Sequence, residues 1–172
     1  ARVMQQWWRA GAAERVREYL RGLLWSLSDE SGGIAWNAPQ VIAETGVLIP
    51  ELVDPYGAIM VSRVIEEPPL HRSGFWAMGR LGKPVAWVLA HFLEPLSRAF
   101  ESGDPQVLGL AAWAMGRTGF APARAWIEAL SGREEKVRIY LEGRFTEKSL
   151  GHWAREALVK LETPKSAEEV DR

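Results

Sequence analysis

The side chains best suited to recognition chemistry are a tryptophan and an arginine that recur together, four residues apart. They belong to a pentapeptide that occurs twice, as Trp76-Ala77-Met78-Gly79-Arg80 and as Trp113-Ala114-Met115-Gly116-Arg117, at an offset of 37 residues. Helical residues four apart share one face, where a guanidinium can lie over or beside an indole ring. Tryptophan and arginine are enriched at interface hot spots, so this pairing predicts non-covalent recognition of a ligand.

The same register predicts further polar residues on the same surface. In the first copy, positions 74, 77, 78 and 81 form the apolar stripe of a helix, and Trp76 and Arg80 fall outside it. Helices that carry such copies stack about 8–10 Å apart, so equivalent positions of neighbouring units form a ladder along the inner surface. The predicted binding ladder consists of Gln40, Glu44, Trp76, Arg80, Trp113, Arg117, Glu156 and Lys160.

A structural explanation competes with this binding hypothesis. An arginine at the end of such a helix can pair with an acidic residue or a helix end of the neighbouring unit, and Asp54, Asp104 and Glu44 are the candidate partners. The tryptophans can equally pack between units. The sequence leaves both explanations open.

The segment that follows the first helix is a second candidate site. It contains Asp29, Glu30 and Ser31, two glycines and then Trp36. These residues could hold a cation, and the glycines would let the backbone approach a ligand closely. Helix capping and turn formation are the favoured interpretation, because the segment has too few oxygen ligands at the spacing of a calcium-binding loop.

Motifs for covalent, metal or nucleotide chemistry are missing from the sequence. There is no cysteine, and His71, His91 and His152 are scattered without a paired ligand on the same helix face. No Gly-x-Ser-x-Gly elbow, phosphate-binding loop or dinucleotide-binding glycine pattern occurs. We therefore expect no catalytic residues, no metal and no cofactor, and the sequence favours a non-enzymatic role.

The elements that position these residues are predicted to be paired helices. A fixed offset between helix-compatible segments that end in glycine is typical of a stacked helical repeat. The second helix of each pair is expected near 37–45, 71–81, 105–118 and 150–161, with Gly46 just past the end of the first. Alternation of apolar and polar residues predicts an inserted β-hairpin at 137–149, and removing residues 134–146 should leave the helical signal nearly intact.

Composition limits the classes of partner. The chain is 47% hydrophobic and 25% charged, which is typical of a globular protein, and a single domain over 1–162 with a flexible tail at 163–172 is expected. A net charge of −1 argues against nucleic acid, and no apolar run is long enough for a membrane span. A cytoplasmic location is the default. The chain starts at Ala1 inside a predicted element, which suggests a trimmed N-terminus. The sequence does not predict the oligomeric state.

The repeated segments resemble a known family. Residues 74–82 and 111–119 resemble the second-helix motif of the HEAT-like repeats first described in phycobilin lyases, and the likeness covers most of the chain. The chain also resembles a bacterial subgroup of such proteins that has a stretch like residues 25–33, followed by Trp36 and Ala38-Pro39. The resemblance implies an all-α fold, an α-solenoid of about four HEAT-like helical pairs with the hairpin inserted. It does not by itself imply lyase activity, because a fold does not carry chemistry.

Three functions are compatible with this reading. The leading hypothesis is a protein- or peptide-binding scaffold that uses the concave face. The alternative is a bilin-lyase-like enzyme, or a chaperone that holds a flat conjugated small molecule between the tryptophans. A HEAT-like DNA glycosylase is the third option, and the near-neutral charge argues against it.

Overall fold

The computed structural model describes residues 1–28 and 35–162, which are mostly helical and contain one small two-stranded antiparallel sheet. The predicted loop residues Asp29, Glu30 and Ser31 and the predicted tail 163–172 lie outside the described residues. In the described part of the chain, no helix combines the length and the apolar character that a membrane crossing requires.

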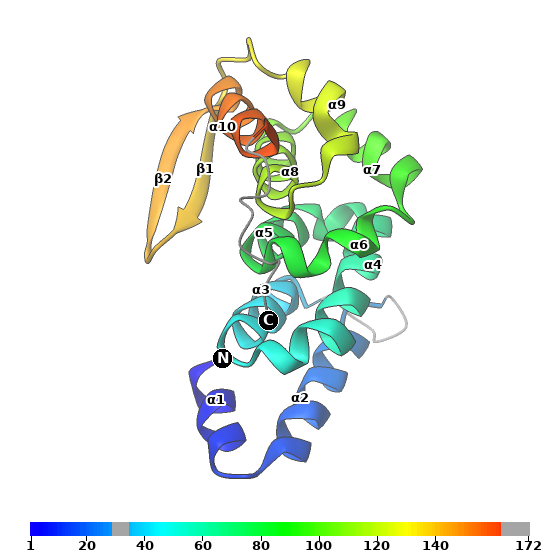
Figure 1. Ribbon diagram of the computed structural model, residues 1–172, viewed down its shortest axis with the longest axis vertical. Coiled ribbons are helices and arrows are strands. Elements are labelled where there is room, and N and C mark those ends of the chain that lie inside the picture. Colours follow the sequence, from blue (N-terminus) through cyan, green and yellow to red (C-terminus); the bar gives the residue numbers. More distant parts are fainter. Residues whose placement is uncertain (29–34, 163–172) are drawn as a thin grey trace, which may run out of the picture.

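Four helices form a central column: α3 (Ala38–Leu48), α5 (His71–Leu81), α8 (Pro105–Thr118) and α10 (Leu150–Glu162). Helix α5 packs between α3 and α8, and α8 packs between α5 and α10 (Figure 1). These helices overlap the ranges predicted for the second helices. The main difference is at the end of α3, which continues through Gly46 to Leu48.

Gly46 was predicted to end this helix, but it lies inside α3 and has a packing role instead. It is buried, and a Cβ atom built on it would lie 3.0 Å from a methyl carbon of Val53 and 3.1 Å from one of Leu81. A glycine therefore lets the following segment and α5 approach α3 closely.

The remaining helices lie on the side of the column away from the sheet or extend it at the N-terminal end (Figure 1). Short helical turns join several of them. The helices are α1 (Arg2–Arg9), α2 (Ala13–Trp25), α4 (Ala58–Glu66), α6 (Ala86–Leu89), α7 (Leu93–Phe100) and α9 (Arg124–Glu128), and the turns are Pro50–Leu52, Val53–Gly57, Pro68–Leu70, Lys83–Val85 and Ala121–Ala123.

The predicted hairpin is present as β1 (Lys136–Leu141) and β2 (Arg144–Ser149), paired antiparallel. Its two-residue turn consists of Glu142 and Gly143, both with positive φ (50° and 85°), as hairpin turns of this length require. Figure 1 shows the hairpin along the side of the column, next to α8 and α10.

The hairpin is part of the core and not a detachable insertion. Val137 and Ile139 of β1 are fully buried. A Cβ atom built on Gly109 of α8 would lie 2.5 Å from a side-chain carbon of Val137, so the strand and the helix pack without a gap. This packing argues against the expectation that removing residues 134–146 leaves the helical signal nearly intact, because the deletion takes out two core side chains.

Candidate functional site

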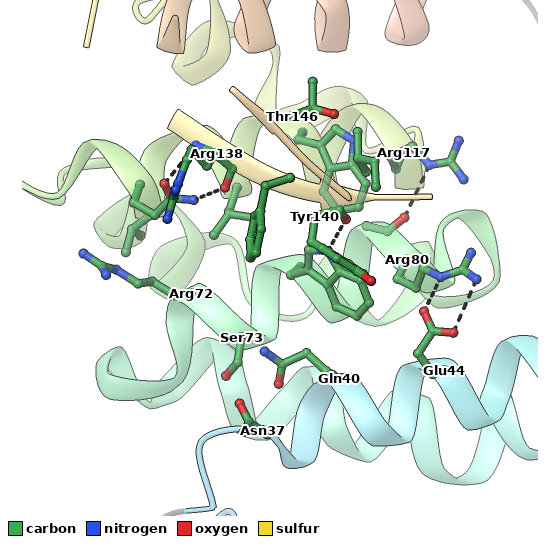
Figure 2. A pocket seen from close by; sticks show the side chains of 18 of the residues that line it. Asn37, Gln40, Glu44, Arg72, Ser73, Arg80, Arg117, Arg138, Tyr140 and Thr146 are labelled. Atoms are coloured by element: carbon green, nitrogen blue, oxygen red, sulfur yellow. Dashed lines mark hydrogen bonds and ion pairs between the residues drawn. The ribbon is translucent and has the colours of Figure 1, made fainter. Parts of the chain in front are cut away.

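A groove of about 1560 Å³ opens along the column, on the side that carries the hairpin. One wall comes from the column helices and the other from the hairpin, as Figure 2 shows. The segment that precedes α5 contributes Pro68 and Pro69, and the N-terminal helix contributes Arg2. Side chains from far apart in the sequence therefore meet in one depression.

All of the predicted ladder residues line this groove. The structure brings together Gln40 and Glu44 of α3, Trp76 and Arg80 of α5, Trp113 and Arg117 of α8, and Glu156 and Lys160 of α10. Trp36, the described residue of the second candidate site, also lines the groove and is 60% exposed. The periodicity of the repeat was enough to predict this grouping.

The two repeated tryptophans are held in different ways. Trp76 is half-buried, and its Nε1–H donates a hydrogen bond of 2.8 Å to the carbonyl oxygen of Tyr140 in β1. Trp113 is only 5% exposed, and a Cβ atom built on Gly79 would lie 2.2 Å from its ring. Trp113 is therefore mainly a packing residue between α5 and α8, which is the structural explanation that the sequence left open for the tryptophans.

The two repeated arginines also differ, and neither stacks on the tryptophan of its own copy. Arg80 Nε donates to Glu44 Oε1 at 2.5 Å, which is the inter-unit ion pair that the structural explanation predicted. Arg117 Nε reaches a carbonyl oxygen, that of Gly79, at 3.4 Å (Figure 2). Asp104 pairs with Arg72 instead. The contacts of Arg117 use little of its donor capacity, because a guanidinium carries five N–H donors.

A small charge network closes the groove at α10. Glu156 lies 3.2 Å from the amino groups of both Lys148 and Lys160. Partial burial opposes ionisation of Glu156, but the hydrogen bonds from the two lysines outweigh it and lower the pKa of its carboxyl below the ordinary value. Glu156 and Lys160 therefore neutralise each other before any ligand arrives.

Side chains of the column hold the hairpin in place by forming hydrogen bonds with the backbone of β1, as a neighbouring strand would do. The amide of Gln106 donates to the carbonyl oxygen of Arg138 at 2.7 Å and accepts from its backbone N–H at 3.1 Å. The indole of Trp153 donates to the carbonyl oxygen of Val137 at 3.2 Å, and Trp76 holds Tyr140 in the same way. The inner edge of β1 is thus fixed to three helices of the column.

The outward face of the hairpin supplies groove residues that the predicted ladder does not include. Tyr140 is 43% exposed and Phe145 is 64% exposed, and their rings meet edge to face with centroids 5.3 Å apart. The guanidinium carbon of Arg138 lies 5.2 Å from the centroid of Phe145. Strand alternation contained the signal for these residues, because Arg138 and Tyr140 alternate with the buried Val137 and Ile139 and must face away from the core, and Phe145 is the strand partner of Tyr140.

The described residues include no cluster of candidate metal ligands. No three histidine, aspartate or glutamate side chains in this part of the chain gather as a metal centre would require. His71 lies outside the groove: its Nε2 is 3.1 Å from the carbonyl oxygen of Ile65, and burial lowers its pKa while that hydrogen bond opposes the effect. The groove therefore offers aromatic faces and guanidinium donors, which suit binding.

Comparison of the chain with family models, with curated proteins and with solved structures gave no match.

Proposed function

We propose that this chain is a non-enzymatic module that binds a protein or peptide partner in the groove between the column helices and the hairpin. The observation that carries the proposal is the size of the groove together with its lining. About 1560 Å³ exceeds the roughly 300–1,000 Å³ that is usual for small-molecule sites, and a protein segment fits the larger space. Exposed Tyr140, Phe145 and Trp36 supply the aromatic surface that is common at protein interfaces.

A HEAT-like solenoid is the architecture we propose for the module. It is supported by the 37-residue offset of the pentapeptides and by the order in which α3, α5, α8 and α10 pack on one another. Repeats of this kind bury their apolar faces only against neighbours, and they commonly use the inner helices to bind partners. A bacterial phycobilin-lyase-type HEAT-like protein is the family we propose on the same grounds.

The two alternative functions have less support. A flat conjugated cofactor held between the two tryptophans needs a free ring face on each, but Trp113 is only 5% exposed and its ring packs on Gly79. A DNA glycosylase needs a continuous basic surface for the phosphates, but the basic residues of this groove come from separate elements and are interrupted by Glu44, Asp104, Glu142 and Glu156.

Capture of partners from the source lysate, analysed by mass spectrometry, tests the proposal. The informative variant is Tyr140→Ser with Phe145→Ser, because both side chains are exposed and their loss should leave the fold intact. Trp87→Ser is the matched control, since Trp87 is 56% exposed and does not line the groove. We expect the wild type and the control to capture the same protein and the double variant to lose it. Equal capture by all three would contradict the proposal.

A further inference from the structure

The charge of the groove differs from that of the whole chain. The sequence has 21 basic and 22 acidic residues. The groove, in contrast, is lined by seven basic and four acidic residues, so its own net charge is +3. The basic residues are Arg2, Arg72, Arg80, Arg117, Arg138, Arg144 and Lys160, and the acidic ones are Glu44, Asp104, Glu142 and Glu156.

Ion pairs within the protein satisfy some of these charges and leave others free. Three acidic residues have partners: Glu44 with Arg80, Asp104 with Arg72 at 2.7 Å, and Glu156 with Lys160. In residues 1–28 and 35–162, no carboxylate lies within ion-pair distance of the other four arginines of the groove. These are Arg2 of α1, Arg117 of α8, Arg138 of β1 and Arg144 of β2.

Arg138, one of the free arginines, lies at an aromatic centre. Arg138 lies over the ring of Phe145, and Phe145 contacts Tyr140, so a cation and two exposed rings form one continuous surface. An anionic ligand alone would leave these rings in water, whereas a ligand with an apolar side chain would cover them. The groove therefore favours a ligand that is both acidic and apolar.

We propose that the partner of the groove is an acidic protein segment in which carboxylate side chains flank an apolar one. One carboxylate would pair with Arg138 beside the two rings, and others would pair with Arg117 of α8 and with Arg144, which follows the hairpin turn on the strand face opposite to Tyr140. Each guanidinium can donate two parallel hydrogen bonds to a carboxylate. The apolar side chain would lie against Tyr140 and Phe145. This inference rests on the proposed binding function and specifies its partner.

Peptide chemistry explains the groove better than nucleic acid does. The free arginines come from four separate elements, and they alternate with Glu142 and with three neutralised ion pairs. A nucleic acid backbone presents evenly spaced phosphates and requires a continuous basic stripe. A protein segment can place its carboxylates only where arginines are free.

Fluorescence anisotropy with defined probes tests the inference on the full chain. The probes are a labelled synthetic peptide in which aspartate alternates with leucine, the same peptide with lysine in place of aspartate, and a short single-stranded DNA. The protein variants are Arg117→Glu and Arg138→Glu, and Arg63→Glu is the control because Arg63 is exposed and lies outside the groove. Circular dichroism checks that each variant folds.

We expect only the aspartate peptide to bind, with an affinity that falls as salt is added. Each groove variant should bind it about tenfold more weakly or worse, because a hydrogen-bonded charge pair is replaced by two like charges, and Arg63→Glu should bind it as the wild type does. DNA binding that is as tight and that is lost in the same variants would overturn the inference in favour of nucleic acid. If the aspartate peptide fails to bind while lysate capture still depends on Tyr140 and Phe145, the acidic partner is wrong and the binding function stands.

Discussion

The two copies of the repeated pentapeptide have the same sequence but different surroundings. In the first copy, Trp76 stays half-buried and bonds to the hairpin, and Arg80 pairs with Glu44. In the second copy, Trp113 is buried against the neighbouring helix, and Arg117 has no carboxylate partner among the described residues. Identical local sequence therefore gives one copy that anchors the groove wall and one that joins two helices.

The neighbouring unit accounts for the difference. Trp113 packs where Gly79 leaves space for its ring. In the repeat register, the residue of α3 that corresponds to Gly79 is Ala43, which is buried and carries the Cβ atom that Gly79 lacks. Trp76 consequently has no such space on α3. The partner surface, more than the motif itself, decides which tryptophan is available to the groove.

The largest expected contrast is between the two tryptophans. Trp113→Ala should lower the free energy of unfolding by about 3–5 kcal/mol, because it empties a buried aromatic site. Trp76→Ala should cost about 1 kcal/mol, mainly through the lost hydrogen bond to Tyr140. Chemical denaturation of both variants measures the difference. Equal losses of unfolding free energy would show that the two tryptophans contribute equally to stability.

Substitutions on the two faces of the hairpin should differ almost as much in their effect on the free energy of unfolding. Ile139→Ala removes a fully buried side chain and should cost about 2–5 kcal/mol. Tyr140→Ser, at the next position and 43% exposed, should stay within about 0.5 kcal/mol of the wild type. Thermal unfolding distinguishes them, and a mild effect of Ile139→Ala would restore the idea of a detachable insertion.

A double-mutant cycle sharpens the account of Gly79. Gly79→Ala alone should destabilise the protein by about 1–3 kcal/mol, because the added methyl collides with the ring of Trp113. In the Trp113→Ala background the same change should cost much less, since the ring is gone. Additive effects in urea unfolding would mean that the two residues do not meet.

The pH dependence of stability tests the burial of His71, which lies on α5 outside the groove. Its pKa is lowered by burial, so the unfolded chain takes up a proton near pH 6.5 while the folded chain resists. The unfolded state then binds more protons, and the free energy of unfolding falls as the pH drops below about 6.5 until the lowered pKa is passed. We expect His71→Gln to flatten this slope between about pH 7 and 5.5 in urea titrations. An unchanged slope would contradict the assignment.

The smallest effects should come from the repeated arginines. Arg80→Ala should cost about 0.2–1 kcal/mol, because its pair with Glu44 is partly exposed. Arg117→Ala should change stability by less than about 0.5 kcal/mol, as expected for a free surface side chain. A larger loss for Arg117 than for Arg80 in thermal unfolding would show that Arg117 is structural.

Much of the helical arrangement could be predicted from periodicity. The offset of the pentapeptides identified α5 and α8, and the stripe that contains Ala77 and Met78 is buried as predicted. Gly46 misled the prediction of where α3 ends, because a glycine needed for close packing reads the same in sequence as one that ends a helix. The close contacts with Val53 and Leu81 distinguish the two roles.

The sequence predicted which residues lie together in the candidate site, but it did not predict the contacts that each of them makes. The register correctly grouped Trp76, Arg80 and Trp113 in one groove. Whether an indole is free depends on long-range partners, such as the carbonyl of Tyr140 and the space at Gly79, and these follow from packing. The role of the hairpin as a wall was missed for the same reason, because its hydrogen bonds to Gln106 cross more than thirty positions of sequence.

The indole N–H signals of a ¹H–¹⁵N correlation spectrum test the central claim most directly. The chain has nine tryptophans, and single Trp→Phe variants assign their signals. On addition of the aspartate–leucine peptide, we predict shifts at Trp36 and Trp76, which line the groove, and none at Trp25 and Trp87, which are exposed outside it. Shifts confined to Trp25 and Trp87 would place the binding surface elsewhere and contradict the account.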